Sequence, residues 1–318
     1  MMLKTTYQSY FSEYANIDCL IWGYGHEQRN SIDVFKMWFK NNRNAKFIVF
    51  IEKNYRKTFD KDIISLDFQY GNLLVIEFDN KGLIDHNHLK EFITYLDSQN
   101  DTREFTIDVT GVSREHLLII LHLLRTTHKS NIKIVYISCE YGKYSVENYT
   151  LPQNNKFFEG KPVLGQPTAM ILLAGYENMA CKVLINAYQP NKLFIGFSDT
   201  PIESNQNLPE RASVDMLTQD YIGEADMTIE EFEYKANDFS ATYKSLCDLV
   251  KKYHLENEYN IILSSCTSKL ATIGMYLFHE DYPETQYVYT IGKKKDISQK
   301  MLNVFEIPLS KELENLLQ

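Results

Sequence analysis

The sequence has few cysteines and no long hydrophobic run, and each shortage excludes a class of protein. Its five cysteines are odd in number and form no CxxC pair, so neither a disulfide framework nor a zinc site is predicted. No apolar stretch reaches the roughly 18 to 20 residues that a membrane span needs. The N-terminus also lacks the apolar segment of a signal peptide. We therefore expect a reduced, cytoplasmic protein without membrane contact.

Positive charge is also scarce. The chain carries 33 Lys and Arg against 42 Asp and Glu, for a net charge of -9. Residues 156–318 hold 15 of these basic residues against 23 acidic ones, and the only basic run is Lys293 to Lys295. A protein that coats duplex nucleic acid usually presents a basic face, so duplex binding is not expected. A small anionic ligand held by a few local groups remains open.

Several catalytic signatures are missing. The sequence contains no Walker A, GxSxG, kinase or HExxH motif. The segment from Gly23 to Gln28 begins like GxGxxG but lacks the third glycine, so it gives little support for NAD or FAD. Of the eight histidines, only His86 and His88 have an HxH spacing, and they fall at an expected helix start, so a metal site is not indicated. We predict no cofactor and no metal.

Strand-like and helix-like segments alternate along the chain. Hydrophobic residues make up 44% of 318 residues, which is enough for two domains with real cores. The alternation predicts an α/β fold with parallel sheets covered by helices. Three of the eight prolines fall between Leu151 and Pro167, where no periodicity is seen. We therefore expect one Rossmann-like unit at 1–155 and a second at 166–318, with an acidic insertion at about 199–240.

One pattern occurs in both halves. The strand Phe105 to Asp108 leads into a turn rich in hydroxyls, a cation and an apolar helix, and the same order returns after Ile261 to Ser264. Each half also opens with a strand followed by Gly-Tyr. We interpret this as a duplicated Rossmann-like unit whose two copies are related by pseudo-two-fold symmetry. The alternative is that any two α/β domains show a similar succession of strands, turns and helices.

The turns carry the candidate ligand-binding residues, because ligands of open parallel sheets bind beyond the carboxyl ends of the strands. Hydroxyls and backbone N–H groups at a helix N-terminus suit an anion. The residues are Gly23, Tyr24, Thr110, Gly111, Ser113 and Arg114 in the first half, and Gly175, Tyr176, Glu177, Ser265, Thr267, Ser268 and Lys269 in the second. The plainer alternative is that the hydroxyls only cap helices and the charges are solvated.

The glycines permit a close backbone approach, and Tyr24 and Tyr176 could stack on a base. Glu27 and Glu177 fall early in predicted helices, where a carboxylate also favours the helix dipole. A functional role for these glutamates, as hydrogen-bond acceptor or general base, is the other interpretation.

The turn Val109 to Arg114 resembles the Leu-Thr-Gly-Gly-Thr-Lys turn of CARF domains, the Rossmann-like sensors of cyclic oligoadenylates in CRISPR-linked defence. Ser265 to Lys269 resembles it more loosely. The resemblance implies that Thr110, Ser113 and Arg114 hold phosphate and ribose, with Ser265, Ser268 and Lys269 on the other side. Val112 replaces the second glycine, and the second turn has neither. Two such units in one chain also resemble the SAVED sensors of antiphage systems.

The leading hypothesis is a sensor or regulatory subunit that binds a nucleotide-type ligand, such as a cyclic oligonucleotide, in bacterial antiphage defence or stress signalling. No appended nuclease, HEPN or winged-helix domain is recognised, so a separate effector protein is expected. One alternative is an enzyme acting on a nucleotide, a phosphodiesterase or ring nuclease or an N-glycosidase, with His26, Glu27, Arg114 and Lys269 in the chemistry. Another is a non-catalytic scaffold subunit whose acidic segment, residues 212–233, docks a partner.

Overall fold

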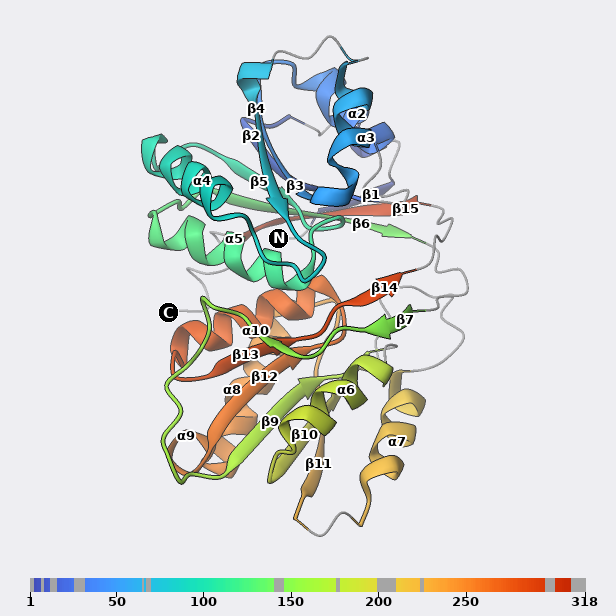
Figure 1. Ribbon diagram of the computed structural model, residues 1–318, viewed down its shortest axis with the longest axis vertical. Helices are drawn as coiled ribbons and strands as arrows, with labels where there is room; N and C mark the ends of the chain where they lie inside the picture. The colour runs from blue at the N-terminus through green and yellow to red at the C-terminus, as the bar shows by residue number, and fades with distance from the viewer. Residues whose placement is uncertain are drawn as a thin grey trace. The chain divides into compact units, whose positions relative to one another are not determined.

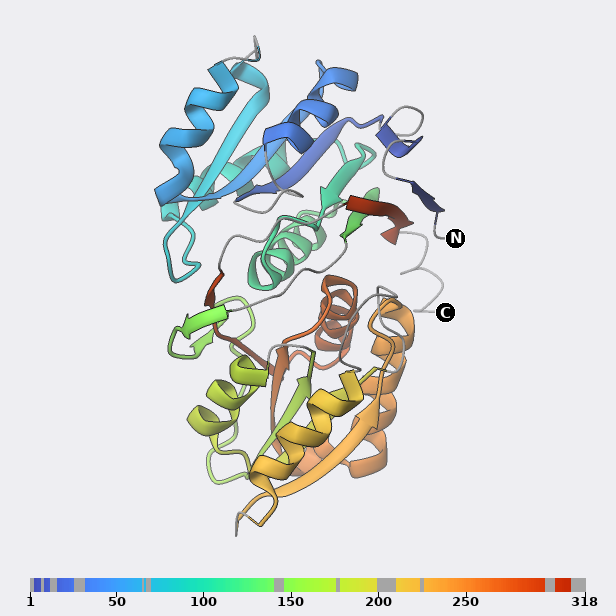
Figure 2. The same ribbon diagram turned by 90° about the vertical axis from the view of Figure 1, so that its right-hand side faces the viewer.

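The chain forms two compact α/β units. The computed structural model describes residues 3–6, 9–11, 16–25, 32–64, 66, 70–139, 146–175, 178–198, 210–223, 226–294 and 301–309. The first unit comprises residues 1–144 and 296–318, and the second comprises residues 145–295. Each unit contains one large sheet with helices on both faces, which is the arrangement that the alternating sequence pattern predicts (Figures 1 and 2).

The first sheet has seven strands in the order β1-β15-β6-β5-β2-β3-β4. The five strands from β6 to β4 are parallel, β15 pairs antiparallel with β6, and β1 pairs antiparallel with β15. The strands are β1 (Leu3–Thr6), β2 (Cys19–Tyr24), β3 (Lys46–Glu52), β4 (Leu73–Phe78), β5 (Phe105–Asp108), β6 (Ile132–Cys139) and β15 (Met301–Pro308). The sequence-based division placed β15 with the second half, whereas it pairs with β6 here.

Helices connect the parallel strands of this sheet. They are α2 (Ile32–Asn41), α3 (Arg56–Ile64), α4 (His86–Ser98) and α5 (Arg114–Thr126), with short 3-10 turns η2 (Lys53–Tyr55) and η3 (Tyr70–Asn72). Helices α2 and α3 cover one face, and α4 and α5 cover the other (Figure 1). The core under α2 is rich in aromatic side chains, with Phe35 packed on Trp22 and Phe47.

The second sheet has six strands in the order β11-β10-β9-β12-β13-β8. The first five are parallel, and β8 is antiparallel to β13. The strands are β8 (Gln153–Asn154), β9 (Thr168–Leu173), β10 (Lys192–Phe197), β11 (Thr228–Glu233), β12 (Asn260–Ser265) and β13 (Gln286–Tyr289). The helices are α6 (Asn178–Tyr188), α7 (Glu210–Tyr221), α8 (Phe239–Tyr253), α9 (Leu255–Glu258) and α10 (Lys269–Asp281). A separate antiparallel ribbon pairs β7 (Val146–Tyr149) with β14 (Gly292–Lys294).

The two large sheets have the same strand order. Among the five parallel strands of each sheet, numbered in chain order, the first (β2 or β9) lies between the second (β3 or β10) and the fourth (β5 or β12). The third parallel strand is at one edge, and the fifth pairs with an antiparallel strand on its other side, β15 in the first sheet and β8 in the second. The order of strands therefore reverses between β2 and β5 in the first unit, and between β9 and β12 in the second. These are the switch points at which α/β proteins bind ligands.

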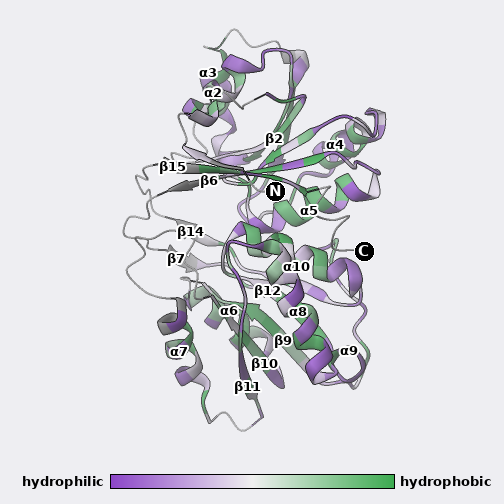
Figure 3. Ribbon diagram, turned by 180° about the vertical axis from the view of Figure 1, so that it is seen from behind, coloured by the Kyte–Doolittle hydropathy of each residue, from purple (hydrophilic) through white to green (hydrophobic). Residues whose placement is uncertain are grey.

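Hydropathy follows the layers. The central strands are predominantly hydrophobic, whereas the outer helices such as α8 alternate between polar and apolar faces (Figure 3). The acidic segment 212–233 contains part of α7 and the edge strand β11, rather than short helices alone. Within the described part of the chain, no helix is both long and apolar enough to cross a membrane.

Candidate functional site

The first switch point brings two segments into close contact at the carboxyl ends of β2 and β5. These strands are parallel, with Trp22 opposite Asp108. A Cβ atom on Gly23 would lie 2.5 Å from the carbonyl carbon of Gly111 and 2.8 Å from the amide nitrogen of Val112. Only a glycine allows the β2 backbone to pass this close to the turn after β5. The Gly-Tyr segment and the hydroxyl turn therefore lie side by side.

Hydrogen bonds hold the first turn in place. Thr110 is buried, its hydroxyl accepts from the Ile137 amide at 2.8 Å, and its own amide donates to the Asp108 carboxylate at 3.1 Å. Ser113 is the N-cap of α5, and its hydroxyl accepts from the His116 amide at 3.3 Å. Arg114 is the first residue of α5. The Ser113 hydroxyl thus caps a helix, as the plainer interpretation supposed, whereas the Thr110 hydroxyl bonds the backbone of β6 instead.

Asp108 is a buried carboxylate that the sequence analysis did not single out. It ends β5, is fully buried, and accepts from the Trp38 indole nitrogen at 3.2 Å in addition to the Thr110 amide. Burial, together with the Glu306 and Asp108 carboxylates, raises the pKa of Tyr10 well above its usual value. The sequence signal that could have identified Asp108 is an acidic residue at the carboxyl end of an apolar strand. Asp108 therefore holds the turn in position through the Thr110 amide.

His116 anchors the β4–α4 loop to the start of α5. Its Nε2 atom lies 2.8 Å from the Gly82 carbonyl oxygen, and its ring packs on Phe78 and Phe50 at centroid distances of 4.3 and 5.8 Å. A carbonyl oxygen can only accept, so Nε2 carries the proton in this contact. The imidazole is buried. His116 therefore fixes a second loop at the same edge of the first sheet.

The second switch point repeats the close approach of a glycine to a turn. A Cβ atom on Gly175 would lie 2.5 Å from the carbonyl oxygen of Cys266 and 3.0 Å from the Cα of Thr267. Gly23 is the last residue but one of β2, Gly175 lies just beyond β9, and Cys266 occupies the place of Gly111. The same backbone packing therefore occurs in both units, at the same point of the same topology.

The hydroxyls of the second turn are bonded to the protein. Ser265 and Thr272 share a hydrogen bond of 2.8 Å between their hydroxyls, and Thr267 bonds the Tyr234 hydroxyl at 2.7 Å. Ser268 is the N-cap of α10; its hydroxyl accepts from the Ala271 amide at 3.0 Å and donates to the Ala236 carbonyl oxygen. Lys269 begins α10. Tyr234 was not predicted as part of this edge.

Tyr24 faces the protein rather than open solvent. Its hydroxyl donates to the Asp62 carboxylate at 3.1 Å, and its ring packs on Phe59 at a centroid distance of 5.0 Å. Burial, followed by the hydrogen bond to Asp62, raises its pKa to about 12. Four other candidates, His26, Glu27, Tyr176 and Glu177, lie outside the described residues. Among the residues that are described, no group of three His, Cys, Asp or Glu side chains is arranged to hold a metal.

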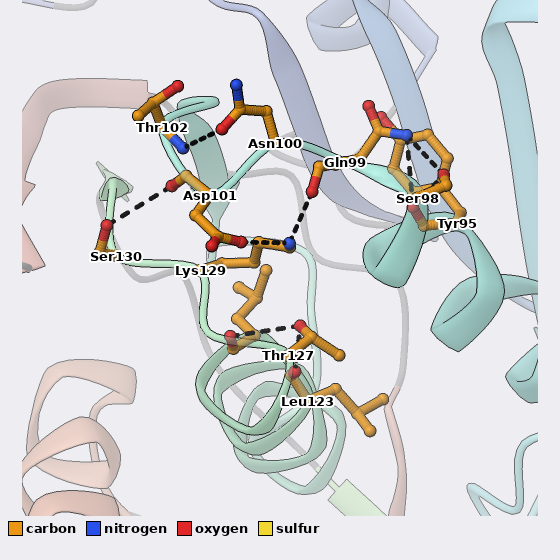
Figure 4. Close-up of polar contacts among 11 residues, drawn as sticks. Tyr95, Ser98, Gln99, Asn100, Asp101, Thr102, Leu123, Thr127, Lys129 and Ser130 are labelled. Atoms are coloured by element: carbon orange, nitrogen blue, oxygen red, sulfur yellow. Dashed lines mark hydrogen bonds and ion pairs between the residues drawn. The ribbon is translucent and has the colours of Figure 1, made fainter.

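The opposite, amino edge of the first sheet has a different character. An open hollow of about 480 Å³ lies there, bordered by Asn16–Asp18, Asn41–Ala45 and the loop around Gln99–Arg103. Nearby, the buried Lys129 ammonium donates to the Gln99 carbonyl at 2.8 Å and the Asp101 carboxylate at 2.9 Å (Figure 4). Arg103 donates to the Asp18 carbonyl at 3.0 Å. Lys129 and Arg103 therefore bind backbone carbonyl groups at this edge of the sheet.

Comparisons with known proteins support the fold. No family model and no curated protein matches the sequence. Among solved structures, the fold is similar to one described as a Type III CRISPR defence DNA nuclease activated by cyclic oligoadenylate. The TM-score is 0.51 at 7% sequence identity, and the similarity covers 88% of this chain and 67% of that one. At this identity the likeness shows a shared fold across most of the chain.

Proposed function

We propose that this protein is a sensor of a nucleotide-type ligand, and that the ligand binds at the carboxyl edge of its parallel strands. The observation that carries the proposal is the repeated switch point, where Gly23 meets Gly111 and Gly175 meets Cys266. This close contact places the turn and the N-terminus of the following helix at the carboxyl edge of the sheet. Backbone N–H groups there can bind an anionic ligand. In the first unit, Arg114 adds a cation at the start of α5.

The fold similarity supports the class of ligand. The similar structure is described as activated by cyclic oligoadenylate and as part of Type III CRISPR defence. We therefore propose a cyclic oligonucleotide as ligand, a role in antiphage defence or stress signalling in the cytoplasm, and a separate effector protein as the partner that receives the signal. The shared strand order of the two sheets supports their origin by duplication of one unit.

Calorimetric titration of the whole chain with cyclic di-, tri- and tetra-adenylate tests the proposal. We expect one of these to bind, and Arg114→Ala to raise its Kd about tenfold or more, because a hydrogen bond to a charged group is worth roughly 1.5–3 kcal/mol. Arg125→Ala is the matched control, since Arg125 lies in the last turn of the same helix. Absence of binding by all three, or equal loss in both variants, contradicts the proposal.

The same samples separate a sensor from an enzyme that acts on a nucleotide. After incubation, chromatography of the ligand detects any linear or hydrolysed product. A sensor returns the ligand unchanged. Steady turnover of the bound ligand would instead favour the enzymatic alternative, and Glu27→Gln would then test whether that side chain takes part.

A further inference from the structure

The two switch points differ in one buried side chain. Tyr234 directly follows β11, and it is 1% exposed. Its hydroxyl lies 2.7 Å from the Ala174 carbonyl oxygen at the end of β9 and 2.7 Å from the Thr267 hydroxyl in the turn after β12. The Tyr234 hydroxyl therefore bridges the end of β9 and the turn after β12. A ligand of the second sheet would have to pass between these two segments to reach the switch point.

The hydrogen-bond pattern fixes where the protons of the second turn go. Tyr234 has one hydroxyl proton, and the Ala174 carbonyl can only accept it, so Thr267 must donate its own proton to Tyr234. Thr272 donates to the Ser268 carbonyl at 3.0 Å, so Ser265 in turn donates to Thr272. These two hydroxyls therefore direct their protons into the protein.

Ser268 completes the set. Its hydroxyl donates to the Ala236 carbonyl oxygen, two residues beyond Tyr234, while it caps α10. The segment 234–236 thus engages both Thr267 and Ser268. With Ser265 committed to Thr272, no hydroxyl of this turn retains a proton to donate to a phosphate oxygen.

The first unit lacks this closure among its described residues. The position after β4 that corresponds to Tyr234 is Asp79, whose carboxylate accepts from the Lys81 and Leu83 amides within its own loop, at 2.8 and 2.9 Å. Ser113 accepts from the His116 amide, and no described residue accepts its hydroxyl proton. The first turn therefore keeps a donor that the second has lost.

Building on the proposed function, we propose that Tyr234 closes the second switch point and that the acceptor groups of the ligand are bound at the first switch point alone. Tyr234 is a positioning residue, because it fixes the proton of Thr267 and the backbone of Ala174. The turn of the second unit then makes no hydrogen bonds to the phosphates of the ligand. A ligand that carries several phosphates is held mainly by the first unit.

Arg114 and Lys269 offer a matched test, because each is the first residue of the helix that follows its turn. The probe is cyclic tetra-adenylate, titrated into the whole chain by calorimetry. We expect Arg114→Ala to raise Kd at least tenfold, and Lys269→Ala to change it less than twofold. Tyr234→Phe should lower the unfolding temperature and leave Kd within twofold. If an alanine variant fails to fold, Arg114→Gln and Lys269→Gln replace the pair.

The outcomes separate this inference from the proposed function. Equal weakening by Arg114→Ala and Lys269→Ala, or a large change in Kd for Tyr234→Phe, would overturn the uneven site while leaving the sensor intact. Tight binding that neither charge variant alters would overturn the inference and place the ligand elsewhere. If wild-type protein binds none of the cyclic adenylates, the proposed function fails, and the inference fails with it.

Discussion

Gly23 passes so close to Gly111 that a Cβ atom on Gly23 would lie 2.5 Å from the Gly111 carbonyl carbon. Both partners in this contact are backbone, so neither can rotate away. We expect Gly23→Ala to lower the free energy of unfolding of the first unit by about 1–3 kcal/mol, which is typical of overpacking. Urea denaturation followed by the fluorescence of Trp22 and Trp38, both in this core, measures the change.

Gly71→Ala is the control for this substitution. Gly71 belongs to the same unit, and a Cβ atom there would meet nothing within 4 Å. Its effect should stay within about 0.5 kcal/mol. If both variants were equally stable, the close approach of β2 to the turn would not exist.

Tyr234→Phe removes one hydroxyl from the second switch point. The Ala174 carbonyl and the Thr267 hydroxyl would both lose their partner in a buried setting. We expect a loss of about 1–3 kcal/mol in the stability of the second unit, which is the penalty of an unsatisfied buried polar group. Circular dichroism during thermal and urea unfolding follows it.

Tyr259→Phe serves as the matched control in the same unit. Tyr259 lies just before β12, and its hydroxyl has no hydrogen-bond partner in the described part of the chain. Its loss should change stability by less than about 0.5 kcal/mol. A neutral Tyr234→Phe would show that the phenol does not bridge the two segments.

Much of the fold was predictable from hydrophobic pattern. Strands β3, β4 and β10 carry a clear sequence signal, because each is a short apolar run between polar residues. Helix α3 carries a weak sequence signal, because only Phe59 and Ile63 of its nine residues are buried. Strand β11 was taken for part of an acidic insertion, because an edge strand exposes its glutamates and so lacks an apolar run.

The candidate site was predictable only in part. Local sequence indicated turns with hydroxyls and a glycine near each, and these lie side by side within each unit. Local sequence did not reveal where the hydroxyl protons go, because Tyr234 and Thr267 are distant in the chain and meet only through sheet order. The same holds for the antiparallel pairing of β15 with β6. Both depend on long-range contacts that no local periodicity encodes.

Asp101 neutralises a buried cation at the amino edge of the first sheet. The Lys129 side chain is 2% exposed, whereas the Asp101 side chain is 64% exposed. Asp101→Asn would leave the ammonium with the Gln99 carbonyl as its remaining hydrogen-bond partner among the described residues (Figure 4). We expect a loss of about 1–2 kcal/mol, less than for a fully buried pair because water reaches the carboxylate.

Lys129→Met provides the complementary measurement for this ion pair. It removes the buried charge and keeps a side chain of similar length, so adding it to Asp101→Asn should recover part of the lost stability. Urea denaturation of the single and double variants at low salt measures the coupling between the two residues. Additive losses would show that the ion pair does not act as a unit.

The Cys19 thiol should make the first unit sensitive to alkaline pH. Burial raises its pKa to about 12, from a usual value near 9, despite the hydrogen bond from the Tyr95 hydroxyl at 3.7 Å. Because the folded state holds this proton more tightly, the stabilising contribution is complete below pH 9. It falls as the pH rises from about 9 to about 12, by up to roughly 1.4 kcal/mol per pH unit.

Cys19→Ala isolates this contribution, since Tyr24 and the other groups that titrate in the same range remain in the variant. The alanine protein should be less stable than wild type at pH 8, because a buried sulfur atom is lost. Urea denaturation at pH 8, 9.5 and 10.5 should show the difference shrinking as the unfolded wild-type thiol ionises. A constant difference across this range would mean that the thiol reaches solvent and ionises in the folded protein.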